Sequence, residues 1–254
     1  MVVSEALSRT GAGAPGVPGS ADTGVIDRAN LSESVYRRIR TALMGGQYAP
    51  GQRLRIGALA EQFGVSITPV REAIFRLVSE GALAMRAATA VSVPLLTADE
   101  LREIQLTRSL LEGALAERAA TRVSPAEIDT LTTTHRAFVR AWGHDPQEAS
   151  HHNREFHLTL ARAGDMPIVQ GVVERMWAMM GPSIHMLNQG LRPRRVGVES
   201  HPHWAVLKAL RSGDAAGARE AIQADIRLSD SVIDWARSRD ALTRGPAADP
   251  PPRG

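Results

Sequence analysis

Apolar residues recur at intervals of three and four along most of this chain, a period that predicts amphipathic helices. In the N-terminal part, Val35, Ile39 and Leu43 mark one face of such a helix. The same period continues in two further segments, at 56–64 and at 68–81. We therefore expect three short helices in succession at the start of the folded chain.

The pattern then changes from a helical period to an alternating one. Residues 81–93 (GALAMRAATAVSV) alternate on both sides of a run of small residues, which indicates a β-hairpin. Three helices followed by a hairpin form the layout of a winged helix-turn-helix, whose third helix enters the major groove of DNA. We predict such a domain over residues 28–96.

The helical period returns after this hairpin and continues to about residue 240. The sequence motifs TADE (97–100) and SPAE (124–127) are capping boxes that mark the starts of two helices. Six helices are predicted, near 97–121, 125–142, 147–164, 167–189, 199–212 and 215–238. Short connections favour an antiparallel bundle. The predicted fold class is therefore mainly α: a winged helix-turn-helix followed by an all-α antiparallel helix bundle over 97–240.

Composition limits what surrounds these domains. Segments 1–27 and 241–254 are rich in Gly, Pro and Ala and have no apolar period, so both are predicted to be disordered tails. The chain contains no cysteine, which excludes disulfides and thiolate metal sites. No apolar run is long enough to span a membrane, and the N-terminus lacks the apolar segment of a signal peptide. We expect a cytoplasmic protein without a membrane partner.

Positive charge is concentrated in the first domain. Residues 31–96 hold eight arginines and four glutamates, a net charge of +4, whereas the whole chain carries +3. A basic domain favours a polyanionic partner. Arg71 points away from the apolar stripe of its helix, and Ser66 and Thr68 at the helix start can cap it or bind phosphate. The residues predicted to contact DNA are Arg38, Arg55, Ser66, Thr68, Arg71, Arg76 and Arg86.

Polar residues interrupt the apolar faces of the helical region. Arg108 lies on an apolar seam, and Asp225 lies beside another one. A buried charge without a partner costs several kcal/mol, so we predict that Arg108 and Asp225 either pair or share a bound ion. Asn153 and His157, four residues apart, can present two ligands to one metal from a single helix.

Two parts of the sequence resemble known families. The segment YAPGQRLRIGALAEQFGVSITPVREAIFRLVSEGALA (48–84) is similar to the DNA-binding domain of GntR-family transcription factors. Segments 108–120, 153–157 and 203–214 resemble the FCD ligand-binding domain, which accompanies that DNA-binding domain in the FadR subfamily. The resemblance implies a homodimeric transcription regulator, more often a repressor, that binds a double-stranded DNA operator with two-fold half-sites. Six helices in the second region favour the VanR-like branch.

Three positions depart from the GntR pattern. Ile67 stands where the family usually has Arg, and Phe75 stands where a polar or basic residue is common. The predicted wing tip, residues 86–90, lacks the usual Gly. We therefore expect the preferred DNA sequence to differ from that of typical relatives.

The same resemblance implies a metal site and an effector. Many FCD domains bind a divalent metal through a D-x-x-x-H motif and two later histidines. By position these ligands are Asn153, His157, His203 and Asp225. One carboxylate and two imidazoles remain in this set, which suits Zn, Ni, Mn or Fe. The residues assigned to effector binding are Arg108 and Glu112. A small carboxylate would bridge the metal and the Arg108 guanidinium.

Two other interpretations remain open. The same four ligands would serve a metal-dependent enzyme with an accessory DNA-binding-like domain, although no motif supplies a general base. Alternatively, the regulator binds its effector through Arg108 alone, without a metal. His201 is a substitute ligand because it lies two residues before His203, and His135 has no predicted partner.

Overall fold

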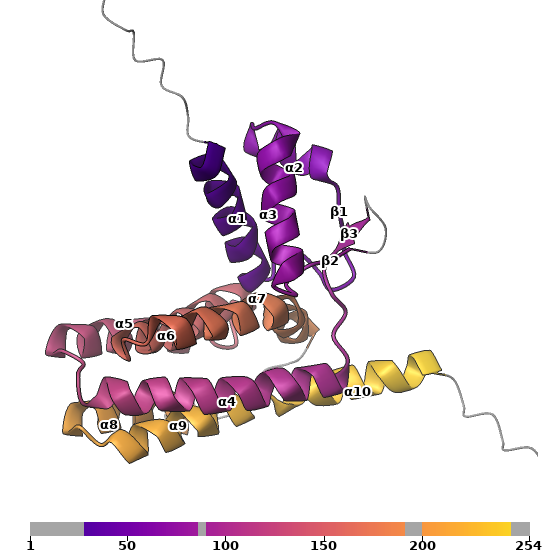
Figure 1. Ribbon diagram of the computed structural model, residues 1–254. Helices are drawn as coiled ribbons and strands as arrows, with labels where there is room; N and C mark the ends of the chain where they lie inside the picture. The colour runs from indigo at the N-terminus through magenta and orange to yellow at the C-terminus, as the bar shows by residue number, and fades with distance from the viewer. Residues whose placement is uncertain (1–27, 86–89, 191–199, 245–254) are drawn as a thin grey trace, which may run out of the picture.

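The computed structural model describes residues 28–85, 90–190 and 200–244 (Figure 1). The predicted tail at 1–27 lies outside the described residues, as does Arg86 at the predicted wing tip. The second predicted tail begins too early at 241, because the last helix continues to Arg244. The rest of that tail, 245–254, also lies outside the described residues.

The N-terminal domain consists of three helices and a small sheet. Its helices are α1 (Arg28–Met44), α2 (Ile56–Phe63) and α3 (Ile67–Ser79), and its strands are β1 (Arg53–Leu54), β2 (Ala84–Met85) and β3 (Val91–Ser92). Strands β2 and β3 pair in antiparallel fashion, with Met85 opposite Val91. The predicted winged helix-turn-helix layout is therefore confirmed.

Strand β1 has no counterpart among the predicted elements. It pairs with β3, so the strand order of the sheet is β1-β3-β2. The strand contains only two residues, exposed Arg53 and buried Leu54, and so short a segment shows no alternating period. Strand β1 connects the start of α2 to the base of the wing.

An apolar core holds this domain together. Val35, Ile39 and Leu43 of α1 are buried in one cluster with Ile74 and Leu77 of α3. Because one face of α3 is committed to this core, its opposite face is left at the surface. No charged side chain is buried in the part of this domain that the structure describes.

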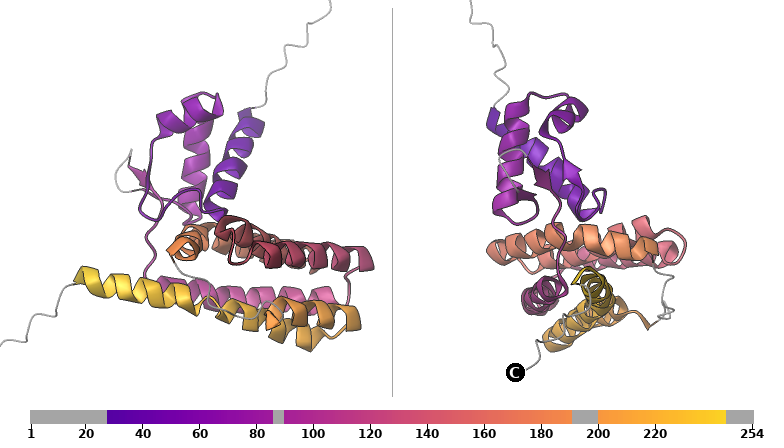
Figure 2. Two further views of the ribbon diagram at one scale, coloured as in Figure 1. Left: turned by 180° about the vertical axis from the view of Figure 1, so that it is seen from behind. Right: turned by 90° about the vertical axis from the view of Figure 1, so that its right-hand side faces the viewer.

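The second, helical domain forms two layers. Its described helices are α4 (Ala98–Ala120), α5 (Pro125–Ala141), α6 (Pro146–Ala163), α7 (Pro167–Gly190), α8 (Pro202–Ser212), α9 (Ala215–Arg227) and α10 (Asp230–Arg244). Helices α5, α6 and α7 lie next to the N-terminal domain, and α4, α8, α9 and α10 form the layer beyond them (Figures 1 and 2). No described helix combines the length and apolar character needed to cross a bilayer.

Both predicted capping boxes are present at the starts of α4 and α5. The side chains of Thr97 and Ser124 accept hydrogen bonds from the backbone N–H groups of Glu100 and Glu127. Each glutamate in turn accepts the N–H of its cap residue, at 2.7 and 2.8 Å. These caps fix where each helix begins and thereby which of its residues face the interior of the bundle.

The prediction of one helix over 215–238 is wrong. The chain leaves the helix at Leu228 and Ser229, between α9 and α10. The Ser229 hydroxyl donates to the carbonyl oxygen of Ile226 at 2.6 Å, in competition with the backbone hydrogen bonds of a continuing helix. Buried apolar residues occur on both sides of this break, Ile222 and Ile226 before it and Val232 and Ile233 after it, so the sequence pattern does not reveal it. The predicted count of six helices is also wrong, and it no longer supports the VanR-like branch.

Helix α7 joins the two domains. Arg40 of α1 forms an ion pair with Glu174 of α7 at 2.9 Å. Gly181 of α7 lies so close to the end of α1 that a Cβ atom there would be 2.6 Å from the Leu43 carbonyl oxygen and 2.8 Å from the Met44 Cα. Only glycine fits this contact without displacing one helix from the other.

Candidate functional site

Two charged residues of α4 meet in the interior of the helical domain. Arg108 and Glu112, one turn apart, are both buried, and the Arg108 Nε donates to Glu112 Oε1 at 2.6 Å. The Arg108 guanidinium also lies 4.0 Å from the centre of the Trp177 ring. A direct pair between Arg108 and Asp225, one of the two predicted arrangements, is therefore wrong, because Arg108 has its carboxylate partner on its own helix.

His157 of α6 connects this pair to Asp225 of α9. Its Nδ1 lies 2.6 Å from Glu112 Oε2, and its Nε2 lies 2.8 Å from Asp225 Oδ2. Burial lowers the pKa of His157, but the negative charge of Glu112 and the hydrogen bond with Asp225 outweigh burial and raise it. Burial raises the pKa of Glu112, but Arg108 and His157 outweigh it and bring that pKa to about 2. His157 is therefore held between two carboxylates that favour its charged form.

Two histidines at the start of α8 also face Asp225. The Nε2 atoms of His203 and His201 lie 3.5 and 3.6 Å from Asp225 Oδ1. Burial raises the pKa of Asp225, but His203 and His157 hold it well below its usual range. His201 is also the N-cap of α8, where its Nδ1 accepts the backbone N–H of His203 at 3.3 Å. Asp225 is thus a carboxylate surrounded by three imidazoles.

His135 of α5 completes this cluster, although no partner was predicted for it. The side chain is fully buried, and its Nδ1 lies 3.1 Å from Nδ1 of His203. The sequence does contain a signal, since Leu131, His135 and Phe138 are spaced to share one helix face and all three are buried. Burial lowers the pKa of His135 to about 3 and that of His201 to about 4, so both rings are neutral at neutral pH.

A cavity of about 150 Å³ opens onto the cluster. Of the predicted site residues, Arg108, Asn153, His157 and Asp225 line it, together with the substitute ligand His201. Its walls come from Phe138, Trp142, Trp177 and Ile184, from Leu228 and Ser229 of the α9–α10 break, and from Ser231 and Val232 in the first turn of α10. The break that the sequence pattern missed therefore forms one side of the cavity. Glu112 and His203 do not line the cavity, but each contacts residues that do: Glu112 contacts Arg108 and His157, and His203 contacts Asp225.

The donor set fits a divalent metal. His157, His203 and Asp225 each offer one ligand atom, and these atoms lie within 4.8 Å of one another. Two imidazoles and one carboxylate, with the Asn153 side chain on the cavity wall, form a set that suits first-row divalent metals. His157 would have to lose the proton that it shares with the two carboxylates, so metal uptake would depend on pH.

The N-terminal half of α3 presents the predicted DNA contacts. Ser66, Thr68 and Arg71 are all exposed there. Ser66 occupies the N-cap position but makes no side-chain capping hydrogen bond, so of its two predicted roles only the phosphate contact remains. Ile67 and Phe75, each 50% exposed, lie on the same helix. An apolar side chain in the major groove can contact the methyl group of thymine. We therefore expect Ile67 and Phe75 to influence which DNA sequence is preferred.

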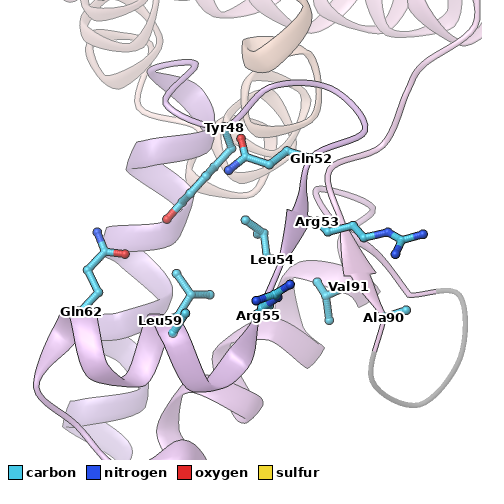
Figure 3. A pocket seen from close by; sticks show the side chains of 10 residues that line it. Tyr48, Gln52, Arg53, Leu54, Arg55, Leu59, Gln62, Ala90 and Val91 are labelled. Atoms are coloured by element: carbon cyan, nitrogen blue, oxygen red, sulfur yellow. The ribbon is translucent and has the colours of Figure 1, made fainter.

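A second hollow lies on the N-terminal domain, between β1, α2 and the base of the wing. It measures about 580 Å³ and is lined by Tyr48, Gln52, Arg53, Leu54, Arg55, Ala58, Leu59, Gln62, Ala90 and Val91 (Figure 3). Neither Arg53 nor Arg55 forms an ion pair within the described part of the chain, so both cations are available to an anion. Arg53 was not predicted as a DNA contact. Arg38, which was, is exposed with its guanidinium 5.6 Å from the Phe63 ring.

Arg76 has a different environment from the other predicted DNA contacts. Its guanidinium donates to Glu33 at 2.6 Å and to Glu80 at 3.3 Å. The same group lies 3.6 Å from the centre of the Tyr36 ring. Two carboxylates already balance its charge, so Arg76 serves to join α1 to α3.

Comparisons with known proteins agree with both domains. The model of "Bacterial regulatory proteins, gntR family" matches residues 31–93, and the model of the "FCD domain" matches residues 103–228. The HTH-type transcriptional regulator McbR of Escherichia coli K12 is 32% identical over 212 residues, which cover 83% of this chain and 96% of that protein. The HTH-type transcriptional regulator BphR of Paraburkholderia xenovorans LB400 is 26% identical over 223 residues, 84% of this chain and 90% of the relative.

Solved structures show the same arrangement. E. coli McbR/YncC superposes with a TM-score of 0.75 at 31% identity, covering 81% of this chain and 97% of the other. A regulator from Rhodococcus sp. RHA1 superposes with a TM-score of 0.66 at 20% identity, covering 82% and 99% of the two chains. The second likeness shows a shared fold.

Proposed function

Because this chain belongs to the gntR family of bacterial regulatory proteins and carries an FCD domain, we propose that its helical domain binds a small organic acid and thereby sets the affinity of the winged helix-turn-helix for an operator. The relatives and solved neighbours are transcriptional regulators, so this chain is a DNA-binding regulator and not an enzyme. The observation that supports an acid as effector is the cavity lined by Arg108, His157 and Asn153.

One group on the cavity wall, the Arg108 guanidinium, favours an anion. Glu112 accepts from the Nε of Arg108, but a guanidinium has five N–H donors, so donors remain for a ligand. His157 and Asp225 also line the cavity but are paired with each other at 2.8 Å, so Arg108 is the group that attracts an anion. The cavity of about 150 Å³ matches the volume of roughly five water molecules, so it suits an acid of only a few carbon atoms.

A divalent metal fits the same proposal. Asn153, His157, His203 and Asp225 would hold it, and a bound cation would supply open coordination positions for a carboxylate. We keep the metal-free pocket as the second candidate, because the structure pairs His157 with two carboxylates and gives Arg108 direct access to the cavity. The two candidates differ in whether acid binding requires the metal.

A panel of short monocarboxylic and hydroxy acids tests the proposal by thermal shift and calorimetry. The protein is measured after chelation and after reloading with zinc, nickel, manganese or iron. We expect one acid to raise the melting temperature of wild type, and Arg108→Lys to lose that response because an ammonium lacks the two-point geometry. Arg118→Lys, at an exposed position of the same helix, is the matched control. The absence of any response in both metal states would contradict acid binding.

We further propose that the regulator is a homodimer that reads a two-fold operator as a repressor, as a DNA-bound protein in the cytoplasm. Leu106 and Leu110 support the dimer, since they are 60% and 59% exposed and lie four residues apart on α4. A second copy covering this strip would place two α3 helices in two half-sites. Light scattering of Leu106→Glu/Leu110→Glu should give a monomer, whereas Ile168→Glu, at a residue that is 86% exposed elsewhere, should leave the wild-type mass.

A further inference from the structure

Three imidazoles meet around His203, which presents its Nδ1 to His135 and its Nε2 to Asp225. One ring nitrogen each of His135, His201 and His203 lies within 4.8 Å of the other two. All three side chains are buried, with exposures of 0%, 7% and 0%. The predicted ligand set uses His203, with His201 as its substitute ligand, so His135 is the member that extends this group beyond that set.

The contact between His135 and His203 has the spacing of two ligands on one metal. Their Nδ1 atoms are 3.1 Å apart. Two nitrogens bound to a tetrahedral zinc at about 2.0–2.1 Å each are separated by roughly 3.3 Å. The Nε2 atom of His135 is buried without a hydrogen-bond partner among the described residues, whereas that of His203 lies 3.5 Å from Asp225 Oδ1. Apolar side chains would fill this space without that desolvation cost.

Aromatic rings hold the three imidazoles in place. His203 is stacked on Phe156 with ring centres 3.8 Å apart, and His135 lies edge-on to Trp204 at 4.5 Å. The rings of His201 and Phe138 lie 4.8 Å apart. This packing fixes the ring orientations in advance, as a metal site requires. His201 also lines the cavity, which gives an ion a route in from solvent.

We propose that His135, His201 and His203 form a second cation site, which takes a nitrogen-preferring divalent metal such as Zn²⁺, Ni²⁺ or Co²⁺. The site shares His203 with the predicted ligand set, to which that residue presents its other ring nitrogen. A neutral imidazole has a single lone pair. The chain therefore fills one of the two sites at a time. The three-histidine site does not depend on the proposed acid effector.

Titration of chelated, full-length protein with Co²⁺ tests the proposal. We expect one Co²⁺ per chain, with the intense visible bands of tetrahedral cobalt. His135→Gln and His201→Ser should each weaken binding roughly tenfold or more. Serine is a favoured N-cap residue, so His201→Ser removes the imidazole while keeping a cap on α8. His157→Gln should keep the wild-type affinity within about twofold, and His144→Gln, at an exposed position, is the control.

X-ray absorption of the zinc-loaded wild type adds a readout that requires no variant, because it counts imidazole ligands. Three imidazoles support the proposal. Two imidazoles with a carboxylate, together with a loss of cobalt binding in His157→Gln alone, would overturn it and place the metal in the predicted set. If the wild type takes up no cobalt, both metal sites fail, and the acid panel on chelated protein still decides the proposed effector.

Discussion

The two domains place their charged side chains in opposite ways. In the described part of the N-terminal domain, the buried side chains are apolar, and Arg55 and Arg71 lie at the surface. The helical domain buries polar and charged side chains: Arg108, Glu112, Thr132, His135, Arg154, His157, Ser183, His201, His203 and Asp225. Both domains have apolar cores of their own, so this difference concerns function more than folding.

The contrast matches DNA binding by the first domain and the proposed acid binding by the second. Exposed arginines are screened by salt but remain free to neutralise phosphates, which is what DNA binding requires. Buried ions each cost several kcal/mol and are tolerated only with close partners. A domain that keeps a chain of four such groups, from Arg108 through Glu112 and His157 to Asp225, at the wall of a cavity has the properties of a ligand site.

The largest expected effect comes from breaking the buried pair. Arg108→Met leaves the two buried carboxylates Glu112 and Asp225 to share His157 alone, so one negative charge is unbalanced and the free energy of unfolding should fall by about 3–5 kcal/mol. Arg76→Met removes the ion pairs that a 50% exposed arginine forms with Glu33 and Glu80, and each should cost about 0–1 kcal/mol. Urea unfolding of the two variants measures the difference. Adding Glu112→Gln to Arg108→Met should recover part of the loss, and equal losses in the two single variants would contradict the contrast.

A pH series should show the next largest effect. The pKa of Glu112 falls from 4.5 to about 2 on folding, so its contribution is present above pH 4.5 and is lost as the pH falls toward 2. The raised pKa of His157 acts in the other direction, because its contribution is present below pH 6.5 and is lost as the pH rises through its folded value. The stability of wild type relative to Glu112→Gln should therefore fall by on the order of 3 kcal/mol between pH 4.5 and 2. A constant difference would show that Glu112 is not paired.

Two separate glycine-to-alanine substitutions in α7 test whether the two domains pack against each other at Gly181. Gly181→Ala forces a Cβ atom against the backbone of Leu43 and Met44, and should cost about 1–3 kcal/mol. Gly171→Ala, on the same helix with no atom near its added Cβ, should stabilise the protein by up to about 1 kcal/mol. Thermal unfolding compares the two. If both variants gain stability, the domains do not pack through Gly181.

The smallest expected effect distinguishes a structural cap from a binding residue. Ser124→Ala removes a capping box in the helical domain and should cost about 1 kcal/mol. Ser66→Ala removes a hydroxyl that caps nothing, so stability should change by less than about 0.5 kcal/mol while affinity for DNA falls. Chemical denaturation and a DNA-binding assay on both variants separate the roles. A cost of about 1 kcal/mol at Ser66 would show that it does cap α3.

Periodicity predicted most of the fold, because each amphipathic helix needs only its own residues to show its apolar face. It also placed Arg108, His157 and Asp225 in the interior, since each interrupts or flanks an apolar seam. It did not predict strand β1, which is too short to have a period. It also missed the break at Leu228 between α9 and α10, because buried apolar residues occur on both sides of it, at Ile226 and at Val232 and Ile233.

The sequence alone could not predict which charged side chains of the site pair with one another, for a physical reason. Arg108 had two carboxylates within reach, Glu112 on its own helix and Asp225 on another, and only the packing of α4 against α6 and α9 decides between them. The same holds for His135. Its position on an apolar helix face could be predicted from the sequence, but its contact with His203 depends on how α5 packs against α8. Residue spacing along a helix predicts which side chains share a face, whereas the packing of helices against one another decides which side chains come into contact.

The central claim is that the charged interior of the helical domain controls the DNA affinity of the N-terminal domain. Fluorescence anisotropy with a promoter fragment taken from DNA next to the coding sequence tests it, with and without the acid found by thermal shift. We expect the acid to change the DNA dissociation constant of wild type by roughly 5–150-fold and to leave that of Arg108→Lys unchanged. An acid that binds wild type without altering its DNA affinity, or that alters both proteins equally, would contradict the claim.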